Sequence, residues 1–490
     1  MKAKVLSLVL IGLLAPNSVS QRQAPRAKIA DEVRQEFLHA WNDYKKYAWG
    51  HDDLNPLTKT PHDWYAEPLL MTPVDALDTM ILMGLKDEAR ATREYIATHL
   101  SFDKDISVQN FEITIRLLGG LLSSYELTGD QRLLHLAEDL GNRLLPVFNS
   151  PTGLPYRYVN LKTGKVRDNL TNPAEAGTLL IEFGTLARLT HRQVFYDKAK
   201  RSLVEIYHRR SPIGLVGTWI NVETGQWTDT DSHISGAIDS YYEYLLKCWL
   251  LFNDEDCRKM WLDSVKAINT YLADAKLRDV TVATKSSPSL QGSDAETWYG
   301  HADMNNGKRG ATTFGALDAF FPAVLVLSGD DDRARRLQES SFKMWKLNGI
   351  EPEELDYQTM QVTSPGYALR PEIVESTYYL YHYALIDARR RYFPEARQKL
   401  NPNDFQVMGE TMWRDFVKYC RNDVGYAALE SVITKKKADS MQSFLFAETF
   451  KYFYLLFAPP QTLDFNRVIF NTEAHPIRRQ WPNQKTTAKS

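Results

Sequence analysis

Apolar residues recur along much of this chain at the spacing of an α-helix, and the clearest case is the stretch 111–130. Its apolar side chains fall at positions i, i+1, i+4, i+5 and i+8, as Leu117, Leu118, Leu121, Leu122 and Tyr125. This spacing places them on one face of a helix. Gly129 follows, and glycine is common directly after a helix. The pattern therefore predicts a helix that buries one face and ends near Gly129.

The same kind of apolar helix, with an acidic residue at or near its head, is repeated along the chain. Three of the predicted helices also end alike, in Leu-Thr-Gly-Asp (127–130), Leu-Thr-His-Arg (189–192) and Leu-Ser-Gly-Asp (327–330). Helices of this kind bury their apolar faces only against neighbouring repeats. We expect inner helices near 70–84, 110–128, 173–190, 234–252, 313–328, 371–388 and 441–457.

Between these segments lie more highly charged helical patterns, such as 133–145, 194–209 and 256–275. We predict that these are outer helices with one solvent-exposed face. Two connectors, 153–164 and 214–225, match in Gly, Leu, Asn, Thr and Gly at one common offset. Each is predicted to be a short strand that ends in a turn. The predicted fold is all-α with small β-hairpins, an (α/α)7 barrel with the hairpins along one rim.

Length and charge limit the class of protein and the partners it can have. The chain has 490 residues and a formal net charge of −2, and no long basic run indicates a nucleic-acid partner. The start combines lysines, an apolar run and small residues, which predicts a signal peptide at 1–20. We expect a single catalytic domain over 21–480 and a polar tail at 481–490. No segment is long and apolar enough to predict stable membrane insertion.

The three cysteines, Cys248, Cys257 and Cys420, allow one disulfide but no disulfide framework. Cys248 lies in an apolar helical pattern, so a buried free thiol is the favoured prediction for it. A leader sequence predicts a secreted or periplasmic protein, or one of the endoplasmic reticulum lumen if the host is eukaryotic. A monomer is expected.

The repeated acids carry the candidate chemistry. If the inner helices run side by side, six carboxylates meet at one end of the barrel: Glu112, Glu175, Asp239, Glu372, Glu375 and Glu448. Such a group could hold a hard cation among oxygen ligands or hydrolyse a glycosidic bond by acid and base catalysis. The alternative is that each acid caps its helix. Asp318 has apolar neighbours, and capping or core pairing is the favoured interpretation for it.

Five sequence motifs lie at 111–116, 238–244, 369–376, 447–452 and 470–475. In their sequence and their order along the chain they resemble those of glycoside hydrolase family 47, the class I α-mannosidases, and the resemblance runs over about 33–477. The resemblance implies an (α/α)7 barrel closed by a C-terminal hairpin, with a bound Ca²⁺. It also implies inverting, exo-acting hydrolysis of α-1,2-linked mannose in high-mannose-type glycans, so the expected partner is a mannose-containing oligosaccharide or glycoprotein glycan.

The resemblance also implies roles for individual residues. Glu112 would be the general acid, acting through a water, and Glu372 the favoured general base. Asp239 would be the third catalytic carboxylate, as either acid or base. Thr472 would be the one direct protein ligand of Ca²⁺. The residues that would line the sugar site are Arg116, Glu175, Arg370, Glu375, Phe444 and Glu448.

The chain departs from the ordinary processing mannosidases at 316–322, where Ala-Leu-Asp-Ala-Phe-Phe-Pro replaces a cysteine-bearing motif. That segment, with 364–371 and 209–215, is similar to the branch of ER-degradation-enhancing mannosidase-like proteins. A catalytically weak glycan-binding protein on the same fold is therefore the first alternative. A lyase or a terpene cyclase is the second alternative. A lyase would need a Tyr, His or Lys base, but the repeated positions are carboxylates, and the acidic run 330–332 is not embedded in an apolar helix as a diphosphate–metal motif of a cyclase would be.

Overall fold

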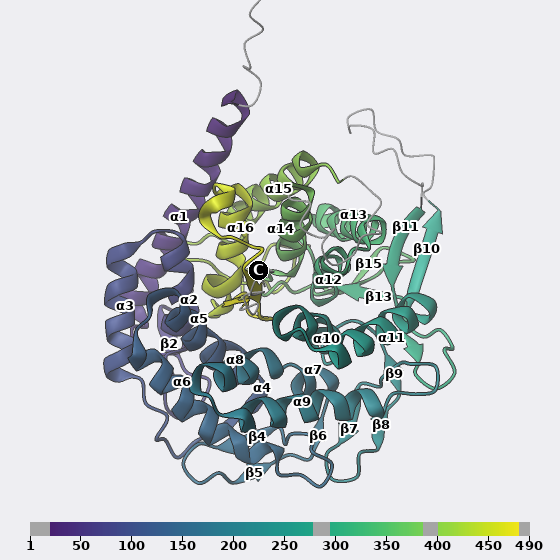
Figure 1. The fold of residues 1–490 in the computed structure, drawn as a ribbon. Helices are drawn as coiled ribbons and strands as arrows, with labels where there is room; N and C mark the ends of the chain where they lie inside the picture. The colour runs from purple at the N-terminus through teal and green to yellow at the C-terminus, as the bar shows by residue number, and fades with distance from the viewer. Residues whose placement is uncertain (1–19, 278–294, 386–399, 480–490) are drawn as a thin grey trace, which may run out of the picture.

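A computed structural model describes residues 20–277, 295–385 and 400–479 of the chain. Within these residues, seven inner helical segments pack in a closed ring, each against the next and the last against the first (Figure 1). The inner segments are α2 (Met71–Leu82), α4–η1–α5 (Asn110–Thr128), α7 and α8 (Pro173–Gly177 and Leu180–Thr190), α10 (Asp239–Phe252), η3–α12 (Leu317–Ser328), α14 (Glu372–Leu385) and η5–α16 (Leu445–Phe457).

Each inner helix carries one outer helix on its far side, and the N-terminal helix completes the ring by packing on α16. The contact between α1 and the last inner helix is aromatic, with the ring of Phe37 5.3 Å from Phe446 and 5.8 Å from Phe450. The outer helices are α1 (Ser20–Tyr47), α3 (Lys86–His99), α6 (Gln131–Leu144), α9 (Gln193–His208), α11 (Glu255–Tyr271), α13 (Asp331–Asn348) and α15 (Pro402–Cys420). The predicted (α/α)7 barrel is confirmed.

The helix ends explain why the sequence repeats were visible. Gly129, His191, Asn253 and Gly329 follow α5, α8, α10 and α12 in the left-handed conformation, with φ of 75°, 58°, 56° and 93°. A residue in this conformation stops a helix and lets the chain turn back. The outer helices then begin with acidic caps, since Asp130, Asp254 and Asp330 accept backbone N–H bonds at the starts of α6, α11 and α13.

Short antiparallel strands connect the helices at one end of the ring. The two matching connectors form β4 with β5 and β7 with β8, so the predicted hairpins are confirmed at the predicted offset. The further strands are β1 (Asp53–Asn55), β2 (Thr60–His62), β3 (Ser107–Gln109), β6 (Leu170–Thr171), β9 (Asp231–Ser232), β10 (Ala273–Leu277), β11 (Ala295–Tyr299), β12 (Ala302–Asp303), β13 (Thr313–Gly315), β14 (Glu354–Asp356) and β15 (Gln361–Ser364). The two connectors themselves comprise β4 (Tyr158–Asn160), β5 (Val166–Arg167), β7 (Trp219–Asn221) and β8 (Trp227–Asp229). Short 3-10 turns, Leu145–Phe148 and Pro460–Thr462, complete the connections.

A C-terminal hairpin closes the barrel from within. Its strands β16 (Val468–Phe470) and β17 (Pro476–Arg478) pair antiparallel and pack against α10 and α5. The turn between them carries Thr472 and Glu473. Lys451 donates to the carbonyl of Ala474 at 2.6 Å, and Asn471 accepts from the backbone N–H groups of Glu473 and His475. The Lys451 bond therefore ties this turn to α16.

One cysteine prediction is wrong. Cys248 of α10 is not a free thiol but forms a disulfide with Cys257 of α11, nine residues away. The helical pattern hid this because α10 ends and α11 begins between the two cysteines, which brings their faces together. Cys420 is a buried free thiol.

Two other predictions concern the ends of the chain. The predicted signal peptide and polar tail fall almost wholly outside the described residues and stay predictions. Among the helices described, none is long and apolar enough to cross a membrane.

Candidate active site

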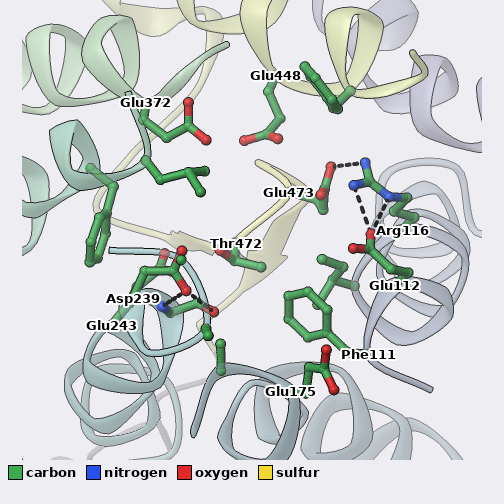
Figure 2. Close-up of a pocket in the computed structure, with 18 of the residues that line it drawn as sticks. Phe111, Glu112, Arg116, Glu175, Asp239, Glu243, Glu372, Glu448, Thr472 and Glu473 are labelled. Atoms are coloured by element: carbon green, nitrogen blue, oxygen red, sulfur yellow. Dashed lines mark hydrogen bonds and ion pairs between the residues drawn. The ribbon is translucent and has the colours of Figure 1, made fainter. Parts of the chain in front are cut away.

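A pocket of about 570 Å³ opens where the first turns of the inner helices meet the closing hairpin. All ten residues that the sequence analysis assigned to a site line this one pocket, from Glu112 to Thr472. Glu243 and Glu473 add two further acids. The eight carboxylates around it are Glu112, Glu175, Asp239, Glu243, Glu372, Glu375, Glu448 and Glu473, and all but Glu375 are labelled in Figure 2.

Arg116 organises one wall of the pocket. Its guanidinium donates to Glu112 at 2.8–2.9 Å and to Glu473 at 2.8 Å, so it joins an inner helix to the C-terminal hairpin. The rings of Trp64 and Phe444 also lie against Arg116, with ring centres 5.1 and 5.7 Å from its guanidinium carbon. These neighbours fix the Glu112 carboxylate at the edge of the cavity.

Arg116 and Glu448 both lie in π-helical turns, Thr114–Leu118 and Leu445–Thr449. A π-helical turn inserts an extra residue into a helix, and such turns are frequent at functional sites. Here each turn belongs to an inner helix and carries a side chain that lines the cavity. Helical periodicity read from sequence assumes 3.6 residues per turn, so it gives no sign of these turns.

Asp239 and Glu372 lie across the cavity from Glu112 (Figure 2). Burial raises the pKa of Asp239 to about 7, although the N–H of Ser240 donates to its carboxylate at 2.8 Å. Burial likewise raises the pKa of Glu372 to about 7, against the lowering effect of Arg370. One oxygen of Glu372 has no hydrogen-bond partner among the described residues. Both acids are therefore poised to exchange protons near neutral pH.

Three further acids, Glu375, Glu448 and Glu243, add negative charge to the lining of the pocket. Burial, offset in part by Lys247, raises the pKa of Glu375 to about 8. Burial raises the pKa of Glu448 well above its usual range, helped by Glu473 and Glu372. Lys247 is buried and pairs with Glu243, one helical turn before it on α10. Among the described residues this lysine is one of few cations facing the cluster, so the acids outnumber their counter-charges.

Two remaining site residues are held by partners outside the cluster. Glu175 accepts from Gln109 at 2.9 Å and from Arg157 at 2.9–3.0 Å, and the side chain of Asn172 caps its helix instead of Glu175 itself. Arg370 pairs with Glu353 at 2.9–3.2 Å and lies 6.0 Å from the ring of Phe444.

Side-chain caps in the described helices come from residues other than the pocket acids, namely Asp130, Asn172, Asp254, Asp330 and Asn401. The residues that precede α4, α10 and η5 make no side-chain cap hydrogen bond. Asp318 differs from the rest, as expected. It does not line the cavity and instead accepts from the backbone N–H of Gly315 at 2.9 Å. Asp52 does not line the cavity either and accepts from the N–H groups of Leu69 and Met71.

The donor set of the cavity suits a hard cation. Thr472 stands among these acids with a hydroxyl and a backbone carbonyl, and the carboxylates around it offer oxygen ligands (Figure 2). Hard cations such as Ca²⁺ take oxygen ligands and waters. Among the described residues, the groups of three or more metal-ligating side chains with atoms within 4.8 Å lie elsewhere. A cation here would therefore meet most of the carboxylates through water.

Sequence reasoning missed several lining residues. Glu243 had a usable signal, because it follows Asp239 by four residues and so shares its helix face. Glu473 adjoins the assigned Thr472. No local sequence pattern could have identified three other lining residues, because they reach the cavity from strands and loops whose packing depends on the whole fold. These are Gln109, Arg157 and Trp219.

Comparisons with known proteins agree with this geometry. The model of glycosyl hydrolase family 47 matches residues 36–479. The mannosyl-oligosaccharide 1,2-alpha-mannosidase MNS1 of Arabidopsis thaliana is 33% identical and aligns with 93% of this chain and 80% of its own length. The ER degradation-enhancing alpha-mannosidase-like protein 2 of Mus musculus is 32% identical and aligns with 92% of this chain and 78% of its own length.

Solved structures give the same picture. The alpha-1,2-mannosidase from Trichoderma reesei superposes with a TM-score of 0.80 at 26% identity, covering 93% of this chain and 99% of that one. Cellobiose 2-epimerase from Spirochaeta thermophila shares the fold alone, with a TM-score of 0.55 at 9% identity. The superposition covers 90% of this chain and 97% of the epimerase. The chain belongs to glycosyl hydrolase family 47 and is a glycoside hydrolase with an α/α-barrel fold.

Proposed function

We propose that this protein is an exo-acting α-mannosidase that removes α-1,2-linked mannose from high-mannose-type glycans, with inversion and with Ca²⁺. The observation that carries the proposal is that Glu112 lies on one wall of a single pocket while Asp239 and Glu372 lie on the opposite wall (Figure 2). The names of the relatives support the substrate class.

In the proposed reaction, Glu112 delivers a proton to the leaving oxygen through a water, and a carboxylate across the cavity accepts a proton from the attacking water. Inverting hydrolysis needs space for that water, with carboxyl groups roughly 6.5–9.5 Å apart. Glu372 is the favoured base because one of its oxygens is free of protein partners. Asp239 is the third catalytic carboxylate.

The remaining residues hold the sugar. Phe444 offers a ring face to it, while Arg116, Arg370, Glu175, Glu375 and Glu448 offer hydrogen-bond partners for its hydroxyls. Thr472 would ligate Ca²⁺ directly. A bound Ca²⁺ would orient water and lower the pKa of the surrounding carboxyls, which suits a base whose pKa is otherwise raised to about 7.

The predicted export of the protein gains support from Cys248–Cys257, because disulfides persist mainly in oxidising compartments.

The deciding experiment measures mannose release from a high-mannose glycan, before and after metal removal, with the first anomer identified by proton NMR. We expect β-mannose first and Ca²⁺-dependent turnover. Initial α-mannose would indicate a covalent nucleophile and overturn the assignment of Glu372. Glycan binding without turnover, in metal-replete protein, would favour the glycan-binding alternative that the likeness to ER degradation-enhancing proteins raises.

A further inference from the structure

Two aromatic side chains stand at matching positions of the repeated hairpins beside the pocket. Tyr158 begins β4 and Trp219 begins β7, at the offset that relates the two connectors. The two hairpins are neighbours along the ring (Figure 1). Trp219 itself lines the pocket, so the pair extends outward from the pocket mouth.

Strand pairing sets the direction of Tyr158. It lies directly opposite Gln109 of β3 and Arg167 of β5. Residues directly opposite in antiparallel strands share one face of the sheet. Gln109 lines the pocket, so Tyr158 and Arg167 continue the same face away from it.

Two arginines interleave with these rings. The guanidinium of Arg157 lies 5.8 Å from the ring of Tyr158 and 5.5 Å from that of Trp219, and Arg167 lies 4.1 Å from Tyr158. Arg157 is fixed by its pair with Glu175 at 2.9 Å. The four residues Arg167, Tyr158, Arg157 and Trp219 form a continuous row, which we name the rim shelf.

The rim shelf is not part of the apolar core. Tyr156 and Trp227 lie on the same two hairpins and pack against that core, whereas Tyr158 and Trp219 are partly exposed and do not. Two partly exposed rings held by a fixed arginine, at the mouth of a pocket, have no evident use in packing. They resemble a binding surface, because aromatic rings supply apolar contact area and arginine supplies a planar set of donors.

We propose that the rim shelf binds the sugars of the leaving glycan next to the mannose held in the pocket. This inference rests on the proposed function. The apolar faces of pyranose rings would lie on Trp219 and Tyr158, and Arg167 would donate to hydroxyls further out. Continuity with the pocket selects this ligand, since Trp219 lines the cavity that the terminal mannose would enter and the rim shelf extends from it. The rim shelf would make the enzyme prefer large glycans to a disaccharide.

The test compares two substrates, a high-mannose oligosaccharide and α-1,2-mannobiose, in four variants: Tyr158→Ala, Trp219→Ala, Trp219→Tyr and Arg167→Ala. The measured quantity is kcat/KM for the glycan divided by kcat/KM for mannobiose. We expect this ratio to fall about 3- to 10-fold in Tyr158→Ala and Arg167→Ala, the size of one such contact, through KM. Trp219→Ala should raise KM for both substrates, because the leaving mannose of mannobiose would also reach Trp219, which lines the pocket. Trp219→Tyr keeps a ring and should keep most of kcat/KM on both. Lys165→Ala is the matched control, since Lys165 is exposed in the turn between β4 and β5.

The outcomes separate three cases. A wild-type ratio in Tyr158→Ala and Arg167→Ala would make the inference wrong while the proposed function stands, and a lower Tm in them would show that the rim shelf only stabilises the hairpins. Equal losses on both substrates in these two variants would place the residues in the pocket's own chemistry and also contradict the inference. If the wild-type protein releases mannose from neither substrate, the proposed function fails and the rim shelf proposal fails with it.

Discussion

Two groups of acids stand at the inner helices, and they differ in the charges and solvent around them. Asp75 and Asp78 of α2 are fully buried, and Asp78 contacts Lys451 at 2.8 Å and His475 at 2.7 Å. Asp239 and Glu372 are half-buried and face a cavity. The first group is neutralised by protein cations, and the second is not.

The pKa values follow this difference. Burial acts to raise the pKa of Asp78, but Lys451 and His475 outweigh it and lower that pKa to about 2. Burial instead raises the pKa of Asp239 and of Glu372 to about 7. Nearby cations can thus reverse the effect of burial on an acid. We infer that the paired group is structural, because it anchors the hairpin that carries Thr472, and that the unpaired group awaits a cation and a substrate.

The largest expected effect is on catalysis. Glu112→Gln, Asp239→Asn and Glu372→Gln should each lower kcat at least about 10²-fold, as expected for loss of an acid or base, while Tm and mannobiose affinity change little. The measurements are kcat, Tm and calorimetric affinity on the same preparations. Early melting with near wild-type turnover in all three would mean that these acids are structural, like Asp78.

Breaking the paired group should instead cost stability. Lys451→Met leaves Asp78 buried with less counter-charge, and removal of one member of a buried pair destabilises by about 3–5 kcal/mol. The measurement is the free energy of unfolding in urea. Asp87→Asn, in the exposed pair with Arg90, is the control and should change that energy by less than about 0.5 kcal/mol. A comparably small change in Lys451→Met would contradict the structural role.

Metal removal should affect only the unpaired group. We expect a chelator to remove most activity and Ca²⁺ to restore it. At a Ca²⁺ concentration of about 100 times Kd, binding to the folded state adds about 2.7 kcal/mol to the free energy of unfolding. Thermal unfolding with and without Ca²⁺ measures this, and Thr472→Val should abolish the shift. Full activity after verified metal removal would refute the Ca²⁺ proposal.

Much of this arrangement could be predicted from sequence, because the barrel is built from local patterns. Apolar periodicity predicted the inner helices, and the Gly129 and Gly329 endings marked where they stop. The repeated acids predicted that Glu112, Asp239 and Glu372 would meet in one place, and they line one pocket. Their catalytic roles remain predictions.

What the sequence could not show depends on contacts between distant residues. Asp78 and Asp239 have similar local sequence contexts, and only the position of Lys451 and His475, hundreds of residues away, separates them. The π-helical turn at Arg116 and the disulfide between Cys248 and Cys257 are local features, but they were missed because neither changes the apolar pattern of the sequence.

The pH dependence of stability should carry opposite signs for the two groups. The folded-state pKa of Asp239 is raised from 3.8 to about 7, so in metal-free protein its contribution to the free energy of unfolding falls as pH rises from about 4 to 7. The folded-state pKa of Asp78 is lowered to about 2, so its contribution is present above about 4 and is lost as pH falls towards 2. Asp239→Asn should flatten the pH 4–7 slope, measured by urea unfolding in chelator. An unchanged slope would contradict the raised pKa.

The smallest expected effect concerns an acid that belongs to neither group. Glu351 follows α13, is fully buried, and both its carboxylate oxygens lack a hydrogen-bond partner among the described residues. Burial, with the charges of Glu372 and Glu353, raises its pKa well above the usual range. Because an unpaired buried polar group costs about 1–3 kcal/mol, Glu351→Met, which keeps the side-chain length, should raise the free energy of unfolding at pH 7 by about 1 kcal/mol. Glu353→Gln should instead lower the free energy of unfolding, because Glu353 pairs with Arg370. Urea unfolding of both variants measures the contrast. If Glu351→Met destabilises the protein instead, Glu351 has a stabilising partner and belongs with Asp78.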